Sequence, residues 1–319
     1  MIKWFLNFLC LIVIVNSGDA QVWLVQPSGQ TGAVNSIFPV NDLTCFAAGN
    51  SIIRTTNGGA NWSSQFGGIG ELYSVYFINT NTGWVTGAMG QIYKTTNSGN
   101  SWQTVGLPTS NTYYSVYFLN DQTGWLAGSA VYKTTNGGIN FSTQNFGIGF
   151  FYSIHFADAS TGWLCGALGQ IYKTTNAGTN WNSQTGNTSV DFNSVYFANS
   201  MTGWCAAANG RIYKSTNGGN NWLNYAGTGS CSMNSVYFND TLSGWAAGCT
   251  GTVFKTINGG LNWQLLSTPV TAALRSVRFV NLNTGWCAGD SGKIIKTTNG
   301  GITMVSPLNN EIPEKFSLY

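Results

Sequence analysis

Three acidic residues of the sequence stand outside its recurring turns and could do chemistry. They are Glu71, Asp191 and Asp290, and Arg211, Arg275 and Lys293 belong to the same variable segments. Two carboxyl groups held about 5 to 9.5 Å apart would suit glycoside hydrolysis. These six residues therefore form the candidate acid and base constellation. The remaining acids between residues 21 and 306 are interpreted as turn residues that cap backbone N–H groups: Asp42, Asp121, Asp158 and Asp240.

Large aromatic side chains gather in the same variable segments. They are Tyr73, Tyr113, Tyr114, Phe150, Phe151, Tyr152 and Phe192. Aromatic rings on a loop surface can stack on sugar rings or anchor a protein partner. They could equally fill the centre of the fold. Together with Arg211 and Arg275, they are the candidate binding surface.

An internal repeat sets the elements that must position these residues. The segment Thr-Thr-Asn-Gly-Gly-x-Asn-Trp recurs at intervals of 39 to 41 residues, and a Gly-Trp dipeptide recurs in the same register. The first copy carries Phe46 where the others carry this Trp. The first Asn of the segment marks seven copies: Asn57, Asn97, Asn136, Asn176, Asn217, Asn258 and Asn299.

Each repeat contains four short β-branched or aromatic runs separated by turn residues, and no stretch has the periodicity of a helix. The pattern predicts an all-β fold over residues 21–306, a seven-bladed β-propeller of four-stranded antiparallel blades with Asp-box-like hairpins. Closing the ring avoids long open sheet edges. The last repeat has Met304 in place of its final Trp. We therefore expect an N-terminal strand, 21–26, to complete the last blade beside residues 294–298.

The repeated segment is interpreted as a structural staple, because Asn can accept N–H bonds across a turn and Gly supplies positive φ. One Lys or Arg stands three residues before each box Asn, from Arg54 to Lys296. We expect its stem to pack between blades and its charged end to bond a neighbouring turn. The single histidine, His155, takes a Tyr position of the repeat and is expected to be a satisfied interior residue. Arg278 occupies the same register in the last repeat and marks a departure from symmetry.

Six of the seven cysteines follow the N-terminal apolar run. Cys231 precedes the first strand of the sixth repeat and Cys249 follows its second, so antiparallel pairing predicts a disulfide between them, as suits an oxidising compartment. The other four are expected to be small buried residues: Cys45, Cys165, Cys205 and Cys287. No Cys-x-x-Cys or His pair suggests zinc, so no metal and no cofactor are predicted.

The repeats share the form Val-Tyr-Phe-x-Asn/Asp-x-x-Thr-Gly-Trp-x-x-Gly-x-x-Gly-x-Ile-Tyr-Lys-Thr-Thr-Asn-Gly-Gly-x-x-Trp. Units of this form resemble the photosystem II assembly and stability factor family, within the Asp-box superfamily. The resemblance spans roughly residues 22–305. It implies a propeller that acts as a non-catalytic binding platform, in a family that includes many exported bacterial proteins. Here Asn replaces the usual Asp of the box, and Lys mostly replaces the usual Arg of the third strand.

Both ends of the chain resemble export signals. Lys3, the apolar run from Trp4 to Val15 and the small residues Gly18 and Ala20 predict a cleaved signal peptide over residues 1–20. Residues 307–319 are interpreted as a linker and the start of a truncated sorting segment, because Glu-Ile-Pro-Glu-Lys-Phe-Ser-Leu-Tyr resembles the C-terminal sorting domain of type IX secretion cargo. The secretion machinery would then be one partner, and the protein would be secreted or displayed at the cell surface.

The amino-acid composition limits the classes of partner that the protein could bind. Only 7% of the residues are charged and the formal net charge is +3, which disfavours binding to nucleic acid. No transmembrane segment is predicted. We expect an exported, monomeric, non-catalytic module that binds a protein or glycan at the cell surface or outside the cell. The alternatives are a secreted glycan-active hydrolase that uses Glu71, Asp191 and Asp290, and a module that only spaces other domains.

Overall fold

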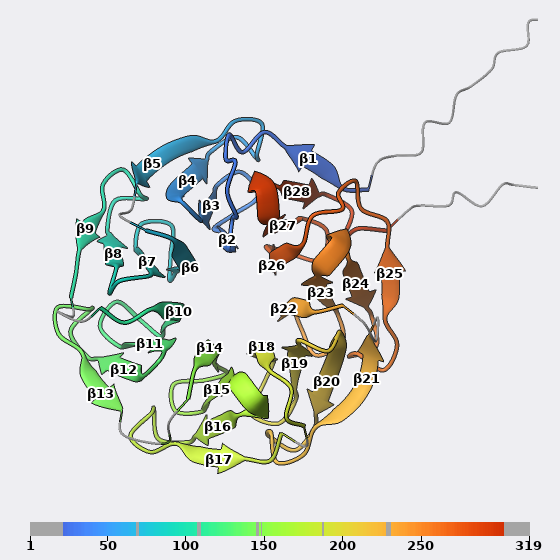
Figure 1. Ribbon diagram of the computed structural model, residues 1–319. Coiled ribbons are helices and arrows are strands. Elements are labelled where there is room, and N and C mark those ends of the chain that lie inside the picture. Colours follow the sequence, from blue (N-terminus) through green and yellow to red (C-terminus); the bar gives the residue numbers. More distant parts are fainter. Residues whose placement is uncertain are drawn as a thin grey trace, which may run out of the picture. The chain divides into compact units, whose positions relative to one another are not determined.

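The computed structural model describes residues 22–302, apart from 68–69, 107–109, 145–146, 148, 187 and 228–230. Seven four-stranded antiparallel sheets surround a central channel, with their first strands innermost (Figure 1). The predicted fold, a seven-bladed propeller, is confirmed. The expected signal peptide and sorting segment lie outside the described residues.

The strands follow the sequence outward through each blade. The first blade contains β2 (Ser36–Pro39), β3 (Cys45–Ala48), β4 (Ser51–Thr55) and β5 (Ser63–Gly67). The second contains β6 (Leu72–Phe77), β7 (Gly83–Gly87), β8 (Ile92–Thr95) and β9 (Gln103–Thr104). The third contains β10 (Tyr113–Phe118), β11 (Gly124–Gly128), β12 (Val131–Thr134) and β13 (Ser142–Gln144). The fourth contains β14 (Phe151–Phe156), β15 (Gly162–Gly166), the 3-10 turn η1 (Ala167–Gly169), β16 (Ile171–Thr174) and β17 (Asn182–Gln184).

The remaining blades follow the same plan. The fifth contains β18 (Phe192–Phe197), β19 (Gly203–Ala207), β20 (Arg211–Ser215) and β21 (Leu223–Gly227). The sixth contains β22 (Met233–Phe238), β23 (Gly244–Gly248), η2 (Cys249–Gly251), β24 (Val253–Thr256) and β25 (Gln264–Leu266). The seventh contains β26 (Leu274–Phe279), β27 (Gly285–Gly289), η3 (Asp290–Gly292), β28 (Ile294–Thr297) and, as its outer strand, β1 (Leu24–Gln26).

The N-terminal strand closes the ring. β1 pairs antiparallel with β28, with Leu24 opposite Lys296 and Gln26 opposite Ile294. Trp23, just before β1, is fully buried and packs edge-on against Phe279 at 6.0 Å between ring centroids. This pairing is the closure that the degenerate last repeat led us to expect.

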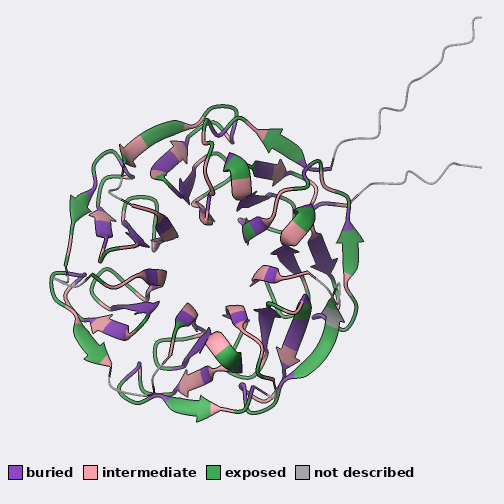
Figure 2. Ribbon diagram, viewed as in Figure 1, coloured by how far each residue is buried: buried purple, intermediate pink, exposed green. Residues whose placement is uncertain are grey.

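Buried aromatic rings join each blade to the next. The Trp of one second strand stacks on the Phe that ends the next first strand, as in Trp163 on Phe197 at 3.5 Å and Trp245 on Phe279 at 3.6 Å. Burying about 200 Å² of such a ring is worth about 5 kcal/mol before entropic costs. A Cβ at Gly83 would come within 2.6 Å of the Phe77 ring, which explains why Gly precedes this Trp. Figure 2 shows the inner strands as buried or intermediate and the outer strands as mostly exposed.

The repeated basic residue clamps neighbouring blades. Lys255 is 8% exposed, donates to the Gly300 carbonyl at 3.1 Å and lies 5.1 Å from the Trp245 ring centroid. Trp245 Nε1 donates to the same carbonyl at 3.1 Å. Lys296 makes the equivalent bond to Gly58 O at 2.8 Å, across the point where the ring closes. The packed stem and bonded amine expected from the sequence are therefore observed.

Each box is held by its own side chains. Asn57 Oδ1 accepts hydrogen bonds from Thr55 Oγ1 at 2.9 Å and from the Asn61 N–H at 3.0 Å, and Thr55 Oγ1 accepts from the Gly59 N–H. Because these bonds stay within the hairpin, the box Asn residues act as turn staples.

Candidate functional site

The described channel contains a cavity of about 360 Å³ at one end. One residue from the first strand of each blade, or from the position just before it, lines this cavity. We call these seven residues the mouth ring: Asn35, Tyr73, Tyr114, Tyr152, Asn193, Asn234 and Arg275.

A β-bulge brings the mouth ring to the channel. In the second blade, Leu72 pairs with Gly87 and Ser74 with Thr86, so Tyr73 is left without a partner in the pairing register. The same shift occurs in the first strands of the third to seventh blades. The bulge breaks the strict alternation of a strand, so that Tyr73 and Ser74 both line the cavity.

A layer of identical serines lies directly beneath the mouth ring. Each serine Oγ accepts the backbone N–H of the residue after the serine of an adjacent first strand. Ser74 accepts from the Val116 N–H at 3.2 Å, and Ser276 accepts from the Ile37 N–H at 3.2 Å where the ring closes. We call this layer the serine ring: Ser36, Ser74, Ser115, Ser153, Ser194, Ser235 and Ser276. Its uniformity identifies it as part of the scaffold.

One side of the mouth ring is aromatic. The ring centroids of Tyr73 and Tyr114 lie 5.2 Å apart, and those of Tyr114 and Tyr152 lie 5.5 Å apart. Tyr73 Oη donates to a Glu71 carboxylate oxygen at 3.0 Å. Burial, and then the hydrogen bond to Glu71, raise the pKa of Tyr73 to about 12. The three rings therefore form a continuous aromatic wall along one side of the mouth.

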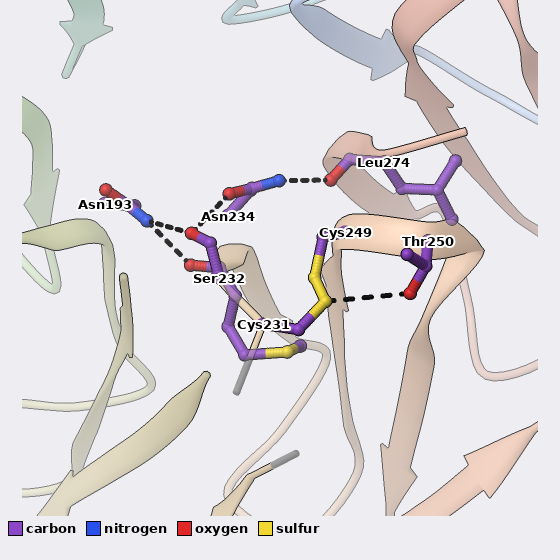
Figure 3. Close-up of a disulfide and its surroundings, with 8 residues drawn as sticks. Asn193, Cys231, Ser232, Asn234, Cys249, Thr250 and Leu274 are labelled. Carbon is purple, nitrogen blue, oxygen red and sulfur yellow. Dashed lines mark hydrogen bonds between the residues drawn. A yellow bond between two sulfur atoms is a disulfide. The ribbon is translucent and has the colours of Figure 1, made fainter. Parts of the chain in front are cut away.

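The other side is polar. The side-chain amides of Asn193 and Asn234 donate to the carbonyl oxygens of Met233 and Leu274 in the following blades, each at 2.9 Å (Figure 3). Asn35 makes the equivalent bond to Leu72 O at 2.8 Å. The Asn35 Oδ1 atom is buried and has no hydrogen-bond partner among the described residues. It is an acceptor that a ligand N–H could satisfy.

All three candidate catalytic acids are engaged by neighbouring groups. Glu71 accepts from Asn35 Nδ2 and Tyr73 Oη, each at 3.0 Å. Asp290 forms an ion pair with Arg275. Asp191 accepts from the Leu168 N–H at 2.9 Å. These carboxylates therefore hold the mouth ring and its adjoining turns in place.

Three aromatic residues assigned to the binding surface are instead buried. Tyr113, Phe151 and Phe192 are 0%, 2% and 0% exposed. They open the first strands at the position that Leu72 and Met233 occupy elsewhere, and they belong to hydrophobic clusters that join neighbouring blades. The bulge explains the difference, because it directs the next residue, and not this one, to the channel.

Two further candidates are exposed but do not line the described channel cavities. Phe150 is 54% exposed and immediately precedes β14. Arg211 is exposed where β20 begins, in the second turn of the fifth blade. Arg275 is the one predicted arginine that reaches the mouth ring.

A disulfide braces the polar side of the mouth. Cys231 and Cys249 are joined, with their Cα atoms 5.8 Å apart (Figure 3). The next residue, Ser232, accepts from Asn193 Nδ2 at 3.0 Å and donates to Asn234 Oδ1 at 2.9 Å. The predicted bridge therefore lies beside two members of the mouth ring. The other four cysteines are free and buried, as expected: Cys45, Cys165, Cys205 and Cys287.

A second cavity of about 220 Å³ follows the first along the channel, and shares the walls of Ser36, Ser74 and Ser153 with it. The third residue after each mouth-ring position lines it. We call these residues the collar: Phe38, Tyr76, Tyr117, His155, Tyr196, Tyr237 and Arg278. The cavity itself is the collar chamber.

The collar rings contact one another around the channel. The ring centroids of Tyr76 and Tyr117 are 4.9 Å apart, and those of His155 and Tyr196 are 4.4 Å apart. His155 Nε2 lies 2.9 Å from the Phe197 carbonyl oxygen, so this nitrogen is the donor. Burial lowers the pKa of His155; the hydrogen bond to Phe197 opposes this and the positive charge of Arg278 adds to it, so that the pKa is about 4. His155 is the satisfied interior residue that we expected.

The described residues contain no group of three His, Cys, Asp or Glu side chains arranged to hold a metal ion. Among them there is also no helix of the length and apolarity needed to cross a membrane.

Comparison with known proteins agrees with the repeat pattern. Residues 147–228 match the family model of photosynthesis system II assembly factor YCF48. This match confirms the resemblance inferred from the repeats. No curated protein matches the chain by sequence.

Solved structures share the fold at low identity. One described as YCF48 bound to D1 peptide has a TM-score of 0.74 and 18% identity, covering 88% of this chain and 98% of its own. YCF48 from Cyanidioschyzon merolae has a TM-score of 0.70 and 18% identity, covering 86% and 98%. The GH74 xyloglucanase from Xanthomonas campestris has a TM-score of 0.71 and 12% identity, covering 87% of this chain and 53% of its own. At these identities the likeness establishes a shared propeller fold.

Proposed function

We propose that the protein is an exported, non-catalytic binding module whose mouth ring binds a segment of a partner protein at the cell surface or outside the cell. This proposal rests on the observation that the sevenfold symmetry of the blades ends at the mouth ring. The serine ring is identical in all seven blades, whereas the adjacent mouth ring contains three Tyr, three Asn and one Arg. Because the mouth-ring side chains differ between blades, the scaffold does not require one residue type there. These side chains are therefore free to recognise a ligand.

The chemistry of the mouth ring suits a polypeptide. Tyr73, Tyr114 and Tyr152 offer an aromatic wall for side chains, of the kind that anchors protein partners. Beside Tyr73, in the adjoining blade, the unpartnered Asn35 Oδ1 can accept a backbone N–H. The description of a YCF48 structure as bound to a D1 peptide supports a polypeptide ligand for this propeller. A glycan is the other ligand class that could stack on the tyrosines, and the experiment below distinguishes the two.

The contacts of the acids favour binding over hydrolysis. A general acid, nucleophile or base must be free to reach the sugar. Asp290 is instead paired with Arg275, and Glu71 accepts two hydrogen bonds from mouth-ring side chains. A glycan-active hydrolase that uses Glu71, Asp191 and Asp290 is therefore the weaker alternative.

Export is proposed from the two ends of the sequence and is supported by the disulfide, because such bridges persist in oxidising compartments. Expression with residues 1–20 in a bacterial host that has type IX secretion tests it. The exported protein should begin at Gln21 by mass spectrometry, because removal of the signal peptide does not need the sorting segment. Retention of an intact Met1 in the cytoplasm would refute export.

The ligand class is tested by screening a displayed peptide library and a glycan array against the propeller. Wild type is compared with Tyr114→Asn/Tyr152→Asn, which introduces the residue of three other blades. Tyr225→Asn, at a partly exposed tyrosine on the outer strand β21, is the control. We expect peptide ligands whose affinity falls about tenfold or more in the double variant and stays unchanged in the control. Glycan ligands alone, release of reducing sugar from them, or equal peptide binding by all three proteins would contradict the proposal.

A further inference from the structure

The collar contains a cation that no described acid neutralises. Arg278 is partly buried and lines the collar chamber, and its guanidinium lies 5.3 Å from the ring centroid of Tyr237. The salt bridge found among the described residues is that of Arg275 with Asp290. The Arg278 guanidinium makes no hydrogen bond to any described residue, and the chamber lining includes no Asp or Glu. Five N–H donors are therefore left for a ligand.

The charge of Arg278 acts across the whole collar. It opposes the burial that raises the pKa of Tyr76 in the second blade and of Tyr237 in the sixth. It adds to the burial that lowers the pKa of His155 in the fourth. Because His155 and the phenols are neutral at pH 7, the chamber carries a single positive charge.

We infer that the collar chamber is a binding site for a small monocarboxylate with an apolar or aromatic substituent. A carboxylate accepts two parallel N–H bonds from one guanidinium. Its one negative charge matches Arg278, whereas dianionic phosphate would keep a second charge uncompensated in a partly buried site. The rings of Phe38, Tyr76 and Tyr196 would pack on the substituent. The volume of about 220 Å³ lies below that of drug-sized ligand sites.

The carboxylate could come from a free small acid or from the C-terminus of a polypeptide. Both present the same group to Arg278, and the site does not depend on the mouth ring being a protein-binding surface. The experiment therefore uses benzoate, an acetylated tetrapeptide that ends in Phe with a free carboxylate, and the same peptide as its C-terminal amide.

Isothermal titration calorimetry compares wild type with Arg278→Tyr and with Tyr225→Asn as the control. Arg278→Tyr introduces the residue found at four other collar positions, so it is compatible with the blade. Tyr225 is on the outer strand β21 and lines neither cavity. Thermal unfolding of each variant checks that it is folded.

We expect benzoate or the free-acid peptide to bind wild type and Tyr225→Asn alike, and to bind Arg278→Tyr about tenfold or more weakly. Binding of benzoate identifies a free acid as sufficient. Binding of the peptide acid alone, with loss for the amide, identifies a chain terminus. Equal binding to folded Arg278→Tyr, or no binding of either carboxylate to wild type at millimolar concentration, would overturn the inference.

Discussion

His155 makes the stability of the propeller depend on pH in a calculable way. It is the single histidine of the chain, and burial in the collar lowers its pKa from 6.5 to about 4. Because the folded pKa lies below the unfolded one, the unfolded chain binds the proton preferentially between these values. The stabilisation is fully present above pH 6.5 and is lost as the pH falls toward 4.

The magnitude follows from the difference between the two pKa values. One pKa unit corresponds to about 1.4 kcal/mol, so wild type should lose about 3 kcal/mol between pH 7.5 and pH 4 through this residue. The reference is His155→Tyr, which introduces the residue of four other collar positions. Carboxylates contribute equally to the two proteins, so the difference between their pH slopes isolates His155.

Two assays test the calculation. Urea unfolding at a series of pH values gives the difference between the slopes, and NMR titration of the one imidazole gives the folded pKa directly. We expect a pKa near 4, which rises in Arg278→Tyr because the neighbouring positive charge is removed. Equal pH slopes for wild type and His155→Tyr, or a pKa near 6.5, would refute the enclosed collar.

Three further predictions concern the scaffold. Lys255→Met should lower the free energy of unfolding, measured in urea, by about 2 kcal/mol, because it removes a charged hydrogen bond and a cation–π contact. The control Lys293→Met, at an exposed lysine, should change it by less than about 0.5 kcal/mol. Equal effects of the two substitutions would contradict the interblade clamp. Asn258→Asp should leave unfolding nearly unchanged because a carboxylate keeps the acceptor for Thr256 and Asn262, and Asn258→Leu should cost about 1 to 3 kcal/mol; the reverse order would contradict the staple. Thiol titration of the denatured mature protein should count four free thiols without reductant and six with it, and six in both cases would exclude the disulfide.

The scaffold could be predicted because the same structural residues recur in every blade. The nearly constant spacing of the box Asn, the Gly-Trp dipeptide and the basic residue predicted the four-stranded blades, the turn staples and the interblade clamp. The closure by β1 was predicted from two features of the sequence. The last repeat has Met304 in place of its final Trp, and the N-terminal segment 21–26 has a strand sequence but belongs to no repeat of its own. The disulfide followed from the antiparallel pairing of β22 with β23.

The site was harder to predict because it depends on a local irregularity. In Tyr113-Tyr114 and Phe151-Tyr152 the two adjacent rings look equivalent, and only the bulge decides which one faces the channel. A signal was available, since Leu72 at the first position marks a buried site in the second repeat. The collar could not be predicted as a cavity because its tyrosines belong to the repeated Ser-Val-Tyr-Phe unit, and nothing in the sequence distinguishes them from the scaffold.

The central claim is that recognition occurs at the mouth ring, where the blades differ. Hydrogen exchange on the complex with a library-selected peptide tests it most directly. We expect new protection at the starts of the first strands, around Tyr73, Tyr114 and Tyr152, and unchanged exchange in the outer strands β5, β13 and β21. Protection confined to the outer strands, with the mouth ring unaffected, would contradict the account.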